Sequence, residues 1–254
     1  MHNKLNIFHI TIPSYGMMML IAIIVVTILG IIICCKEKLQ IRIFLRLEIT
    51  GAIIVIIGSK LWYTLLYLNT DTNSLIKNFM TSGYSSYGAL LFGVFTMYIL
   101  SKYKKINLSV YVEKLFFLIP LFHAFCKVGC FMAGCCYGIC YKGPGAIIYP
   151  DGINALSGIP TFPVQLLEAL LLLLLSIIFY IIKNIFDINV VQMTLIYAGC
   201  YIFTRFLTDF LRYKTDGCIL TITQKFSIIF LFIIISYFFN ISNQRRSLWT
   251  KRKQ

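Results

Sequence analysis

Three charged side chains recur at helical spacing in an apolar run near the C-terminus. Arg205, Asp209 and Arg212 stand at i, i+4 and i+7, so a helix would carry them on one face. Charges inside a membrane are costly and usually face other helices or a wet cavity. An Arg205–Asp209 pair would serve to hold helices together, but Arg212 leaves one positive charge in excess. Because a guanidinium binds phosphate in a bidentate way, this face favours an anionic headgroup as ligand.

A second set of reactive residues lies in the stretch 123–145, which holds a lysine, Lys127, and five of the nine cysteines. The cysteines are Cys126, Cys130, Cys135, Cys136 and Cys140. The spacing of these five cysteines contains no Cys-x-x-Cys motif, and this disfavours both metal binding and disulfide exchange. We therefore predict no metal and no cofactor, and interpret these cysteines as packing residues except for Cys130. The glycines of the stretch permit a close approach of backbone to a ligand.

A third pair of polar side chains opens another apolar run. Gln165 and Glu168 lie one helical turn apart, shortly after Pro163. Proline is favourable at a helix start because its missing N–H would be unpaired there. Glu168 is available either to balance a cation such as Lys127 or Arg205 or to act directly in catalysis. The sequence leaves both interpretations open.

These residues are embedded in a chain that has the composition of a polytopic membrane protein. Of its 254 residues, 59% are hydrophobic and only 13% are charged. The net charge of +14 does not indicate nucleic-acid binding, because the basic residues fall in short clusters between apolar runs. We expect an all-α fold with a single transmembrane domain, 1–254, and a small outer-face lobe at 143–163. The seven expected spans cover about 15–34, 47–67, 87–100, 115–131, 164–182, 190–211 and 225–240.

The distribution of lysine and arginine predicts the orientation of these spans. The loops at 36–46, 102–114 and 183–189 and the C-terminal tail would share one side and carry fourteen of these residues, against four on the other side. Cytoplasmic loops are enriched in lysine and arginine, so we expect the N-terminus outside and the C-terminus in the cytoplasm. The stretch 123–145 then faces the outer side.

Five segments, in the same order, resemble motifs of the prolipoprotein diacylglyceryl transferase family of bacterial membrane enzymes. Tyr15-Gly16 is similar to the family's Tyr-Gly, and 87–93 (YGALLFG) to its His-Gly-Gly-Leu-Ile-Gly segment. The stretch 127–138 (KVGCFMAGCCYG) resembles the signature Gly-Arg-Ile-Gly-Asn-Phe-x-Asn-Gly-Glu-x-x-Gly and its Gly-Cys-Phe-Leu-Ala-Gly-Cys-Cys-Tyr-Gly variant. The segments 163–168 and 205–212 resemble Pro-x-Gln-Leu-Tyr-Glu and Arg-Phe-x-x-Glu-x-x-Arg.

This resemblance implies a reaction and a set of partners. The family moves a diacylglyceryl group from phosphatidylglycerol to the lipobox cysteine thiol of a prolipoprotein signal peptide, releasing glycerol phosphate. It implies a multi-pass protein of the bacterial cell membrane, in contact with the lipid bilayer, with its active site toward the outer face. The expected catalytic residues are Tyr87, Arg205, Glu168 and Asp209. The expected substrate-binding residues are Lys127, Arg212, Tyr15, Gly88, Gly129, Cys130, Gly134, Gly138 and Gln165.

The implied roles follow from the charges that this reaction develops. Lys127, Arg205 and Arg212 suit an anionic lipid, because fixed cations in a low-dielectric site stabilise the departing phosphate. The acceptor thiol must become a thiolate, and Tyr87 or a carboxylate would take its proton. The chain differs from the family motifs at three positions, where Tyr87 replaces histidine, Lys127 arginine and Cys130 asparagine. Lysine keeps the charge but loses the bidentate fork, and tyrosine, with a pKa of about 10, is a weak base at neutral pH.

Two other functions are consistent with the same residues. A lipid-binding or lipid-transport protein would use the same pocket without breaking a bond. A membrane thiol oxidoreductase would use the cysteines of 126–140. No internal repeat is apparent, which disfavours a transporter built from paired halves. The transferase is the function that we expect.

Overall fold

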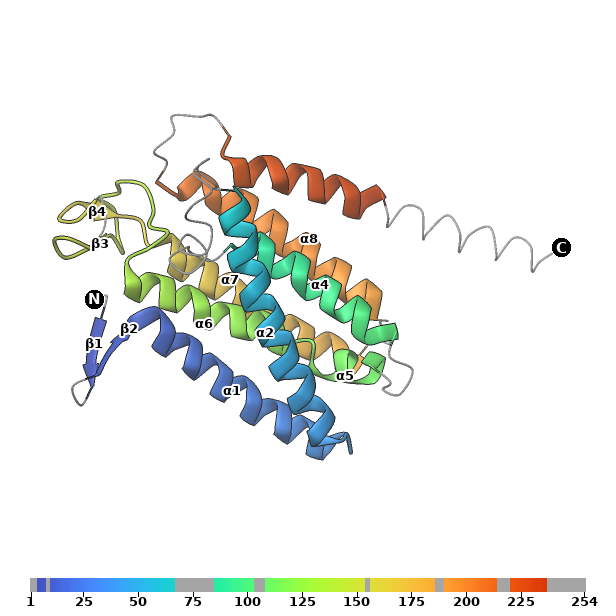
Figure 1. Ribbon diagram of the computed structural model, residues 1–254. Helices are drawn as coiled ribbons and strands as arrows, with labels where there is room; N and C mark the ends of the chain where they lie inside the picture. Colours follow the sequence, from blue (N-terminus) through green and yellow to red (C-terminus); the bar gives the residue numbers. More distant parts are fainter. Residues whose placement is uncertain are drawn as a thin grey trace, which may run out of the picture. The chain divides into compact units, whose positions relative to one another are not determined.

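The computed structural model describes residues 4–7, 10–66, 85–102, 108–153, 156–185, 190–213 and 220–236. Most of these residues lie in helices, and two short antiparallel strand pairs accompany them (Figure 1). The chain divides into a larger unit, Met1–Val26 with Phe116–Gln254, and a smaller unit, Thr27–Leu115.

The larger unit contains most of the residues expected to do chemistry. The hairpin of β1 (Lys4–Ile7) and β2 (Ile10–Pro13) leads into α1 (Ser14–Lys36), whose first half belongs to this unit. The later elements are α6 (Leu118–Ala133), β3 (Ile147–Ile148), β4 (Pro160–Thr161), α7 (Val164–Ile185), α8 (Val190–Thr208), the 3₁₀ turn η2 (Asp209–Leu211) and a last helix, Ile222–Ser236. Helices α6 and α7 run side by side and make the most extensive helix contact of this unit.

The smaller unit is organised by a close contact between α2 (Ile41–Leu66) and α4 (Ser86–Lys102), with α5 (Leu108–Leu115) after them. A Cβ on Gly88 would lie 2.5 Å from the Cβ of Trp62 and 2.9 Å from the carbonyl oxygen of Gly58. Glycine at this position therefore lets the two helix backbones approach.

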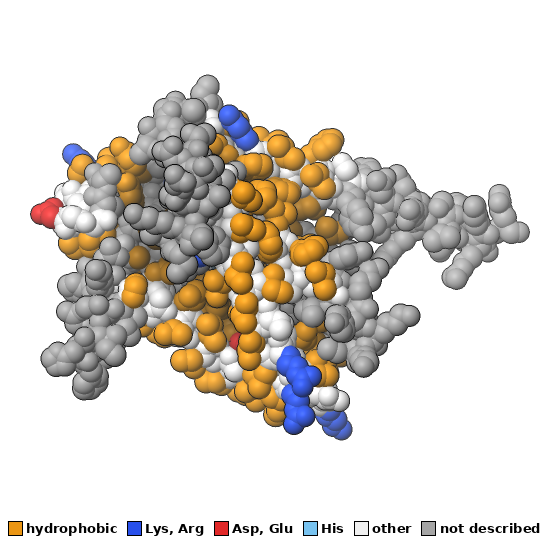
Figure 2. Space-filling view, viewed as in Figure 1, with side chains coloured by type: hydrophobic (Ala, Val, Ile, Leu, Met, Phe, Trp, Pro, Cys, Tyr) orange, Lys and Arg blue, Asp and Glu red, His pale blue; other side chains and the backbone are white. Residues whose placement is uncertain are grey.

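The outer faces of the helices are apolar. On α1, Leu20, Ile24, Ile28 and Ile32 recur every four residues, and each is more than half exposed. Figure 2 shows hydrophobic side chains over the visible helices, with few charged ones among them. Two helices, Ser14–Lys36 and Val164–Ile182, are long and apolar enough to cross a membrane, and shorter apolar helices cover Tyr87–Thr96, Leu118–Ala133 and Ile222–Ser236. Such large exposed apolar faces fit lipid better than water.

Several expected span boundaries differ from the helices. The second helix already begins at Ile41, and the helix in the region of the span expected at about 115–131 begins only at Leu118. There α5 ends at Leu115, a turn follows, and α6 begins at Leu118. Pro120 explains the break, because a proline lacks the N–H that a helix interior requires and is tolerated only in the first turn. Parts of the expected second and seventh spans, residue 67 and residues 237–240, lie outside the described residues.

An extended segment, 137–140, in the loop after α6 forms backbone hydrogen bonds with two other segments, one at Leu211 and one at Phe162. The backbone N–H of Ile139 donates to the carbonyl of Leu211 at 3.0 Å, and its own carbonyl accepts from the N–H of Phe162 at 3.0 Å. A Cβ on Gly138 would lie 2.3 Å from the carbonyl oxygen of Phe162 and 2.9 Å from that of Leu211. Only glycine fits between these two backbones, so Gly138 is required for the three segments to meet.

We expect Gly138→Ala to destabilise the protein by about 1–3 kcal/mol, the usual cost of forcing atoms into a packed position. The midpoint of thermal unfolding in detergent would fall by several degrees. Gly51→Ala is the matched control, because nothing lies within 4 Å of its added Cβ and alanine is the better helix former. An unchanged midpoint for Gly138→Ala would contradict the close approach of the backbones.

Candidate functional site

Glu168 on α7 binds three cations that come from three different segments. Its Oε2 lies 2.8 Å from Nζ of Lys127 on α6, and its Oε1 lies 2.8 Å from Nη1 of Arg205 on α8. Nη2 of Arg212 donates to both carboxylate oxygens, at 2.9 and 2.8 Å. Thr208 completes the shell by donating its hydroxyl to Oε1 at 2.9 Å. A carboxylate with this many charge-assisted donors holds its neighbours in a fixed geometry.

Asp209 is the second carboxylate of the same group. Its Oδ1 lies 3.1 Å from Nη2 of Arg205 and 3.5 Å from Nε of Arg212. Its Oδ2 accepts hydrogen bonds from the hydroxyls of Thr221, at 3.0 Å, and Thr223. We call Lys127, Glu168, Arg205, Asp209 and Arg212 the ion cluster. Their side chains are 3–11% exposed, and their charges sum to one net positive charge.

The contact to Asp209 comes from the start of the last helix, Ile222–Ser236. There the Thr221 hydroxyl accepts from the backbone N–H of Gln224 at 3.1 Å, and the Gln224 side chain accepts from the N–H of Thr221 at 2.9 Å. This reciprocal pair is a capping box, which satisfies backbone donors that the first turn leaves open. These residues were not among those predicted for the site, although the Thr-x-x-Gln pattern before an apolar run is typical of such a cap.

Arg212 reaches the ion cluster by a route that the helical spacing does not predict. The expectation that it continues the helical face of Arg205 and Asp209 is wrong, because α8 ends at Thr208 and Arg212 has extended backbone. It pairs instead with Gly138 in an isolated β-bridge. The segment 137–140 thus places Arg212, while the predicted i, i+4 pair of Arg205 and Asp209 does form.

Two glycines of α6 shape the surroundings of Lys127. A Cβ on Gly129 would lie 3.1 Å from the Cβ of Met18 and 3.2 Å from the ring of Tyr15, so glycine lets α1 pack closely here. Gly134 ends α6 in the left-handed region, at φ 70°, and its N–H caps carbonyls of the last turn. A side chain there would also collide with Ile153, at 2.1 Å.

Gln165 holds the loop that follows α6. Its Nε2 donates to the carbonyl oxygen of Cys135 at 2.8 Å and to the hydroxyl of Tyr149 at 2.9 Å. Tyr149 is fully buried, and burial raises the pKa of its phenol. Among the described residues, Oε1 of Gln165 has no hydrogen-bond partner. Tyr149 was not expected in the site, because an isolated tyrosine in a Gly/Pro-rich loop gives no signal of a buried contact.

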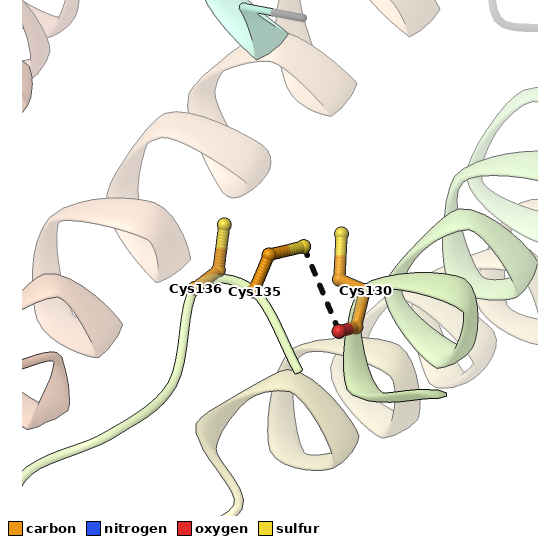
Figure 3. A group of neighbouring side chains, drawn as sticks. All are labelled: Cys130, Cys135 and Cys136. Atoms are coloured by element: carbon orange, nitrogen blue, oxygen red, sulfur yellow. Dashed lines mark hydrogen bonds between the residues drawn. The ribbon is translucent and has the colours of Figure 1, made fainter. Parts of the chain in front are cut away.

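Three cysteine sulfurs converge beside this loop. The Sγ atoms of Cys130, Cys135 and Cys136 all lie within 4.8 Å of one another, and the Cys135 side chain lies between the other two and points toward Cys130 (Figure 3). Contacts with the Cys130 and Cys135 thiols, and then the positive charges of Arg212 and Lys127, hold the pKa of Cys136 well below its usual range. The expectation that Cys135 and Cys136 are packing residues is wrong, because both are exposed.

A small cavity adjoins the ion cluster. Its volume of about 10 Å³ is roughly that of a single water site. It is lined by Lys127, Glu168, Leu171, Leu172, Tyr201, Thr204, Arg205 and Thr208. Within the described part of the chain, the hydroxyl of Tyr201 and Nε of Arg205 lack a hydrogen-bond partner. Two of the lining residues thus have unused donors, but a cavity of this volume is too small for a lipid headgroup.

The predicted residues are distributed over both units. The larger unit brings Lys127, Glu168, Arg205, Asp209 and Arg212 into one cluster and places Gln165, Cys130, Gly134 and Gly138 on the segments around it. Tyr87 and Gly88 belong to the smaller unit, at the start of α4, where Tyr87 is only 3% exposed.

Comparison with known proteins identifies the family of this arrangement. The prolipoprotein diacylglyceryl transferase family matches residues 3–240. The chain belongs to this family. A Clostridium tetani protein named phosphatidylglycerol–prolipoprotein diacylglyceryl transferase is 28% identical over 250 residues, covering 95% of this chain and 97% of the relative. A Clostridium perfringens protein named phosphatidylglycerol–prolipoprotein diacylglyceryl transferase 2 is 29% identical over 242 residues, or 93% of each chain. The family resemblance seen in the sequence is thereby confirmed.

We expect Glu168→Gln to destabilise the protein by about 3–5 kcal/mol, because removing one partner leaves buried charges uncompensated. Glu37→Gln is the control: Glu37 pairs with Lys114 at 3.5 Å, both side chains are more than a quarter exposed, and such pairs contribute about 0–1 kcal/mol. Thermal unfolding of both variants in detergent compares the two effects. Equal midpoints for the two variants would show that the cations do not depend on Glu168.

Proposed function

We propose that this protein transfers the diacylglyceryl group of phosphatidylglycerol to the lipobox cysteine thiol of a prolipoprotein. Membership of the family over residues 3–240 supports this reaction, as do relatives named for it that align over nearly the whole chain. The observation that carries the proposal is the ion cluster. It sets three buried cations against two carboxylates and so retains one positive charge for an anionic ligand.

We further propose that the chain crosses a bacterial cell membrane seven times, with the N-terminus outside and the site toward the outer face. Two helices of spanning length and three shorter apolar helices support a multi-pass arrangement. The excess of lysine and arginine in the loops at 36–46 and 102–114 and in the tail supports the orientation. The outer leaflet then supplies the lipid, and the lobe at 143–163 faces the secreted substrate.

The proposed chemistry is a displacement at the glyceryl carbon that bears the phosphate. The acceptor sulfur, as a thiolate, forms a bond to this carbon while the bond from carbon to phosphate oxygen breaks. The oxygen keeps the electron pair, and glycerol phosphate leaves with one more negative charge than the lipid phosphate had. Fixed cations that face this developing charge lower the barrier, because the low-dielectric site strengthens their effect. Lys127, Arg205 and Arg212 are the cations that we assign to this role.

Lys127 and Arg212 are the best placed of these to accept the lipid phosphate. An ammonium carries three donors, and the Lys127 contact to Glu168 uses one of them. Arg212 is the most exposed member of the ion cluster, at 11%. Because the adjoining cavity holds roughly one water, the phosphate must replace part of their contact with Glu168. Binding is then an exchange of one anionic partner for another.

The carboxylates have a positioning role in this scheme. Glu168 accepts hydrogen bonds from four side chains, which leaves it little capacity to take a proton. The geometry therefore favours the balancing role for Glu168 over direct catalysis. Asp209 orients the two arginines in the same way. Tyr87 remains the proposed proton acceptor.

The remaining predicted residues are proposed to shape the lipid and peptide sites. Tyr15 and Gly129 meet where α1 packs on α6. Gly88 lets α4 approach α2 directly after Tyr87. Gly134, Gly138 and Gln165 fix the loop that carries the cysteines and the strand that places Arg212.

The test supplies labelled phosphatidylglycerol and a lipobox peptide to the purified protein in detergent, and follows the mass of the peptide. We expect the diacylglyceryl adduct on the cysteine peptide and none on the peptide with serine instead. Lys127→Met should slow transfer by about 10²–10³-fold, the usual effect of removing one donor to a developing anion. Lys127→Arg should retain most of the activity, because it keeps the charge.

Lys142→Met is the matched control, since Lys142 is an exposed lysine in the loop after the same helix. Its rate should equal that of the unaltered protein. If lipid co-purifies with the protein while the cysteine peptide stays unmodified, the proposed transferase function is wrong and lipid binding is the function instead. Equal rates for Lys127→Met and Lys142→Met would remove Lys127 from the site.

A further inference from the structure

The three converging cysteines have the composition and geometry of a metal centre. Cys130 lies in the last turn of α6, and Cys135 and Cys136 lie in the loop that follows it. Their sulfurs are within 4.8 Å of one another, and none of the described cysteines forms a disulfide. Three thiolates on one tetrahedral Zn²⁺ would be roughly 3.8 Å apart, given Zn–S bonds of about 2.3 Å. The sulfurs therefore need to approach one another by no more than about 1 Å to bind one Zn²⁺.

The backbone is built to bring the sulfurs together. Gly134, at φ 70°, reverses the chain after α6, and the N–H of Cys135 then donates to the carbonyl of Cys130 at 3.1 Å. Cys136 itself has φ 58°, a left-handed conformation that is unfavourable for a residue other than glycine. Gln165 holds the carbonyl of Cys135 at 2.8 Å. Strain that is held in place by specific contacts is a mark of a functional site.

The exposure and the number of these three cysteines do not fit a packing role or a redox-active cysteine pair. Cys135 and Cys136 are exposed, so burial of apolar surface does not explain them. A disulfide would join only two of the three sulfurs and would not account for the position of the third. Soft cations select thiolate ligands, and zinc sites with three protein ligands keep a fourth position open for water or substrate. The site was not predictable from the cysteine spacing, because Cys-x4-Cys-Cys is not a zinc-knuckle pattern.

The charges around the cluster are compatible with a zinc–thiolate group. Three thiolates and one Zn²⁺ carry a net charge of −1. Arg212 and Lys127 act on the Cys136 sulfur with their positive charges and offset this negative charge. The same cations contact Glu168, so the cysteines and the ion cluster share one electrostatic environment.

We propose that Cys130, Cys135 and Cys136 bind Zn²⁺ and that its open fourth position takes the acceptor thiol as a thiolate. This inference departs from the expectation of no metal and rests on the proposed function for its second half. A thiol that coordinates Zn²⁺ loses its proton, which passes to solvent or to a base. The bound sulfur is then the nucleophile at the glyceryl carbon. The product is an uncharged thioether, a weaker zinc ligand than a thiolate, so it dissociates after transfer.

A metal that ionises the acceptor thiol would also compensate for the weak basicity of Tyr87 at neutral pH. A phenol with a pKa of about 10 is almost fully protonated at neutral pH, so little phenolate is present to take the proton of a free thiol, whose pKa is about 8.5. Coordination removes this difficulty, because the metal lowers the thiol pKa before the attack. The metal would therefore supply the ionisation that Tyr87 alone supplies poorly.

The first test measures metal binding without any reaction. The full-length protein, purified in detergent with Zn²⁺ and then washed with a weak chelator, is analysed for zinc by mass spectrometry. We expect about one Zn²⁺ per chain, and at least a tenfold lower content in Cys130→Ser and in Cys136→Ser. Cys140→Ser is the matched control, because Cys140 is an exposed cysteine of the same loop outside the cluster. A zinc content that is near zero in the unaltered protein, or equal in all variants, would overturn the site.

The second test asks whether the fourth position takes a thiol. Co²⁺ replaces Zn²⁺, and the visible spectrum is recorded while the lipobox peptide is added without lipid. A cysteine peptide should shift the cobalt bands and a serine peptide should not. A bound metal whose spectrum is unchanged by the cysteine peptide would overturn the thiol-binding role.

These readouts are independent of the proposed transfer. If the zinc-loaded protein with phosphatidylglycerol never modifies the peptide, the proposed function fails, while the metal site stands or falls on the zinc content. If transfer occurs, Cys136→Ser should slow it at least tenfold, and Cys140→Ser should leave it unchanged. Full transfer by a zinc-free Cys136→Ser protein would overturn the activating role of the metal.

Discussion

The convergence of three cations on Glu168 is the interaction on which the rest of the structure depends. It joins α6, α7 and the chain beyond α8 through contacts of 2.8 Å between charges that are almost fully buried. A buried ion group adds little to stability against a well-packed apolar alternative, but the loss of one partner is severe, because a charge is then left uncompensated. Lys127, Arg205 and Arg212 are therefore held together by a carboxylate that fixes their geometry, which is what a preorganised anion site requires.

That convergence relies on a piece of backbone that contributes no charge. Arg212 lies beyond the end of α8, and it reaches Glu168 because the segment 137–140 bridges to it. The bridge in turn needs Gly138, whose missing side chain lets three backbones meet. The loop after α6 thus has two functions. It places a cation of the ion cluster on one side, and it carries Cys135 and Cys136 on the other.

The parts of this site that were predictable are those set by local periodicity. The i, i+4 spacing of Arg205 and Asp209 predicted their pairing, and the apolar runs predicted most of the helices. The position of Arg212 depends on a tertiary β-bridge, so the prediction from helical spacing that Arg212 shares a helical face with Arg205 and Asp209 was wrong. The convergence of the cysteines depends on the positive φ of Cys136, which sequence spacing does not encode. The break before α6 was predictable from Pro120, because proline is tolerated in the first turn of a helix and not in its interior, but the uninterrupted apolar run led us to predict a single span.

The first turn of α7 connects the two halves of the proposed reaction. Gln165 binds the carbonyl of Cys135, and Glu168, one turn later, binds the cations. Residues three apart on a helix are separated by roughly 4.5 Å along its axis, a spacing that a rigid helix keeps constant. A displacement at carbon requires the sulfur and the departing oxygen on opposite sides of that carbon, within near-attack distance. The proposed thiol and phosphate sites are anchored to the same helical turn, which would keep the separation of sulfur and phosphate constant, as this requirement demands.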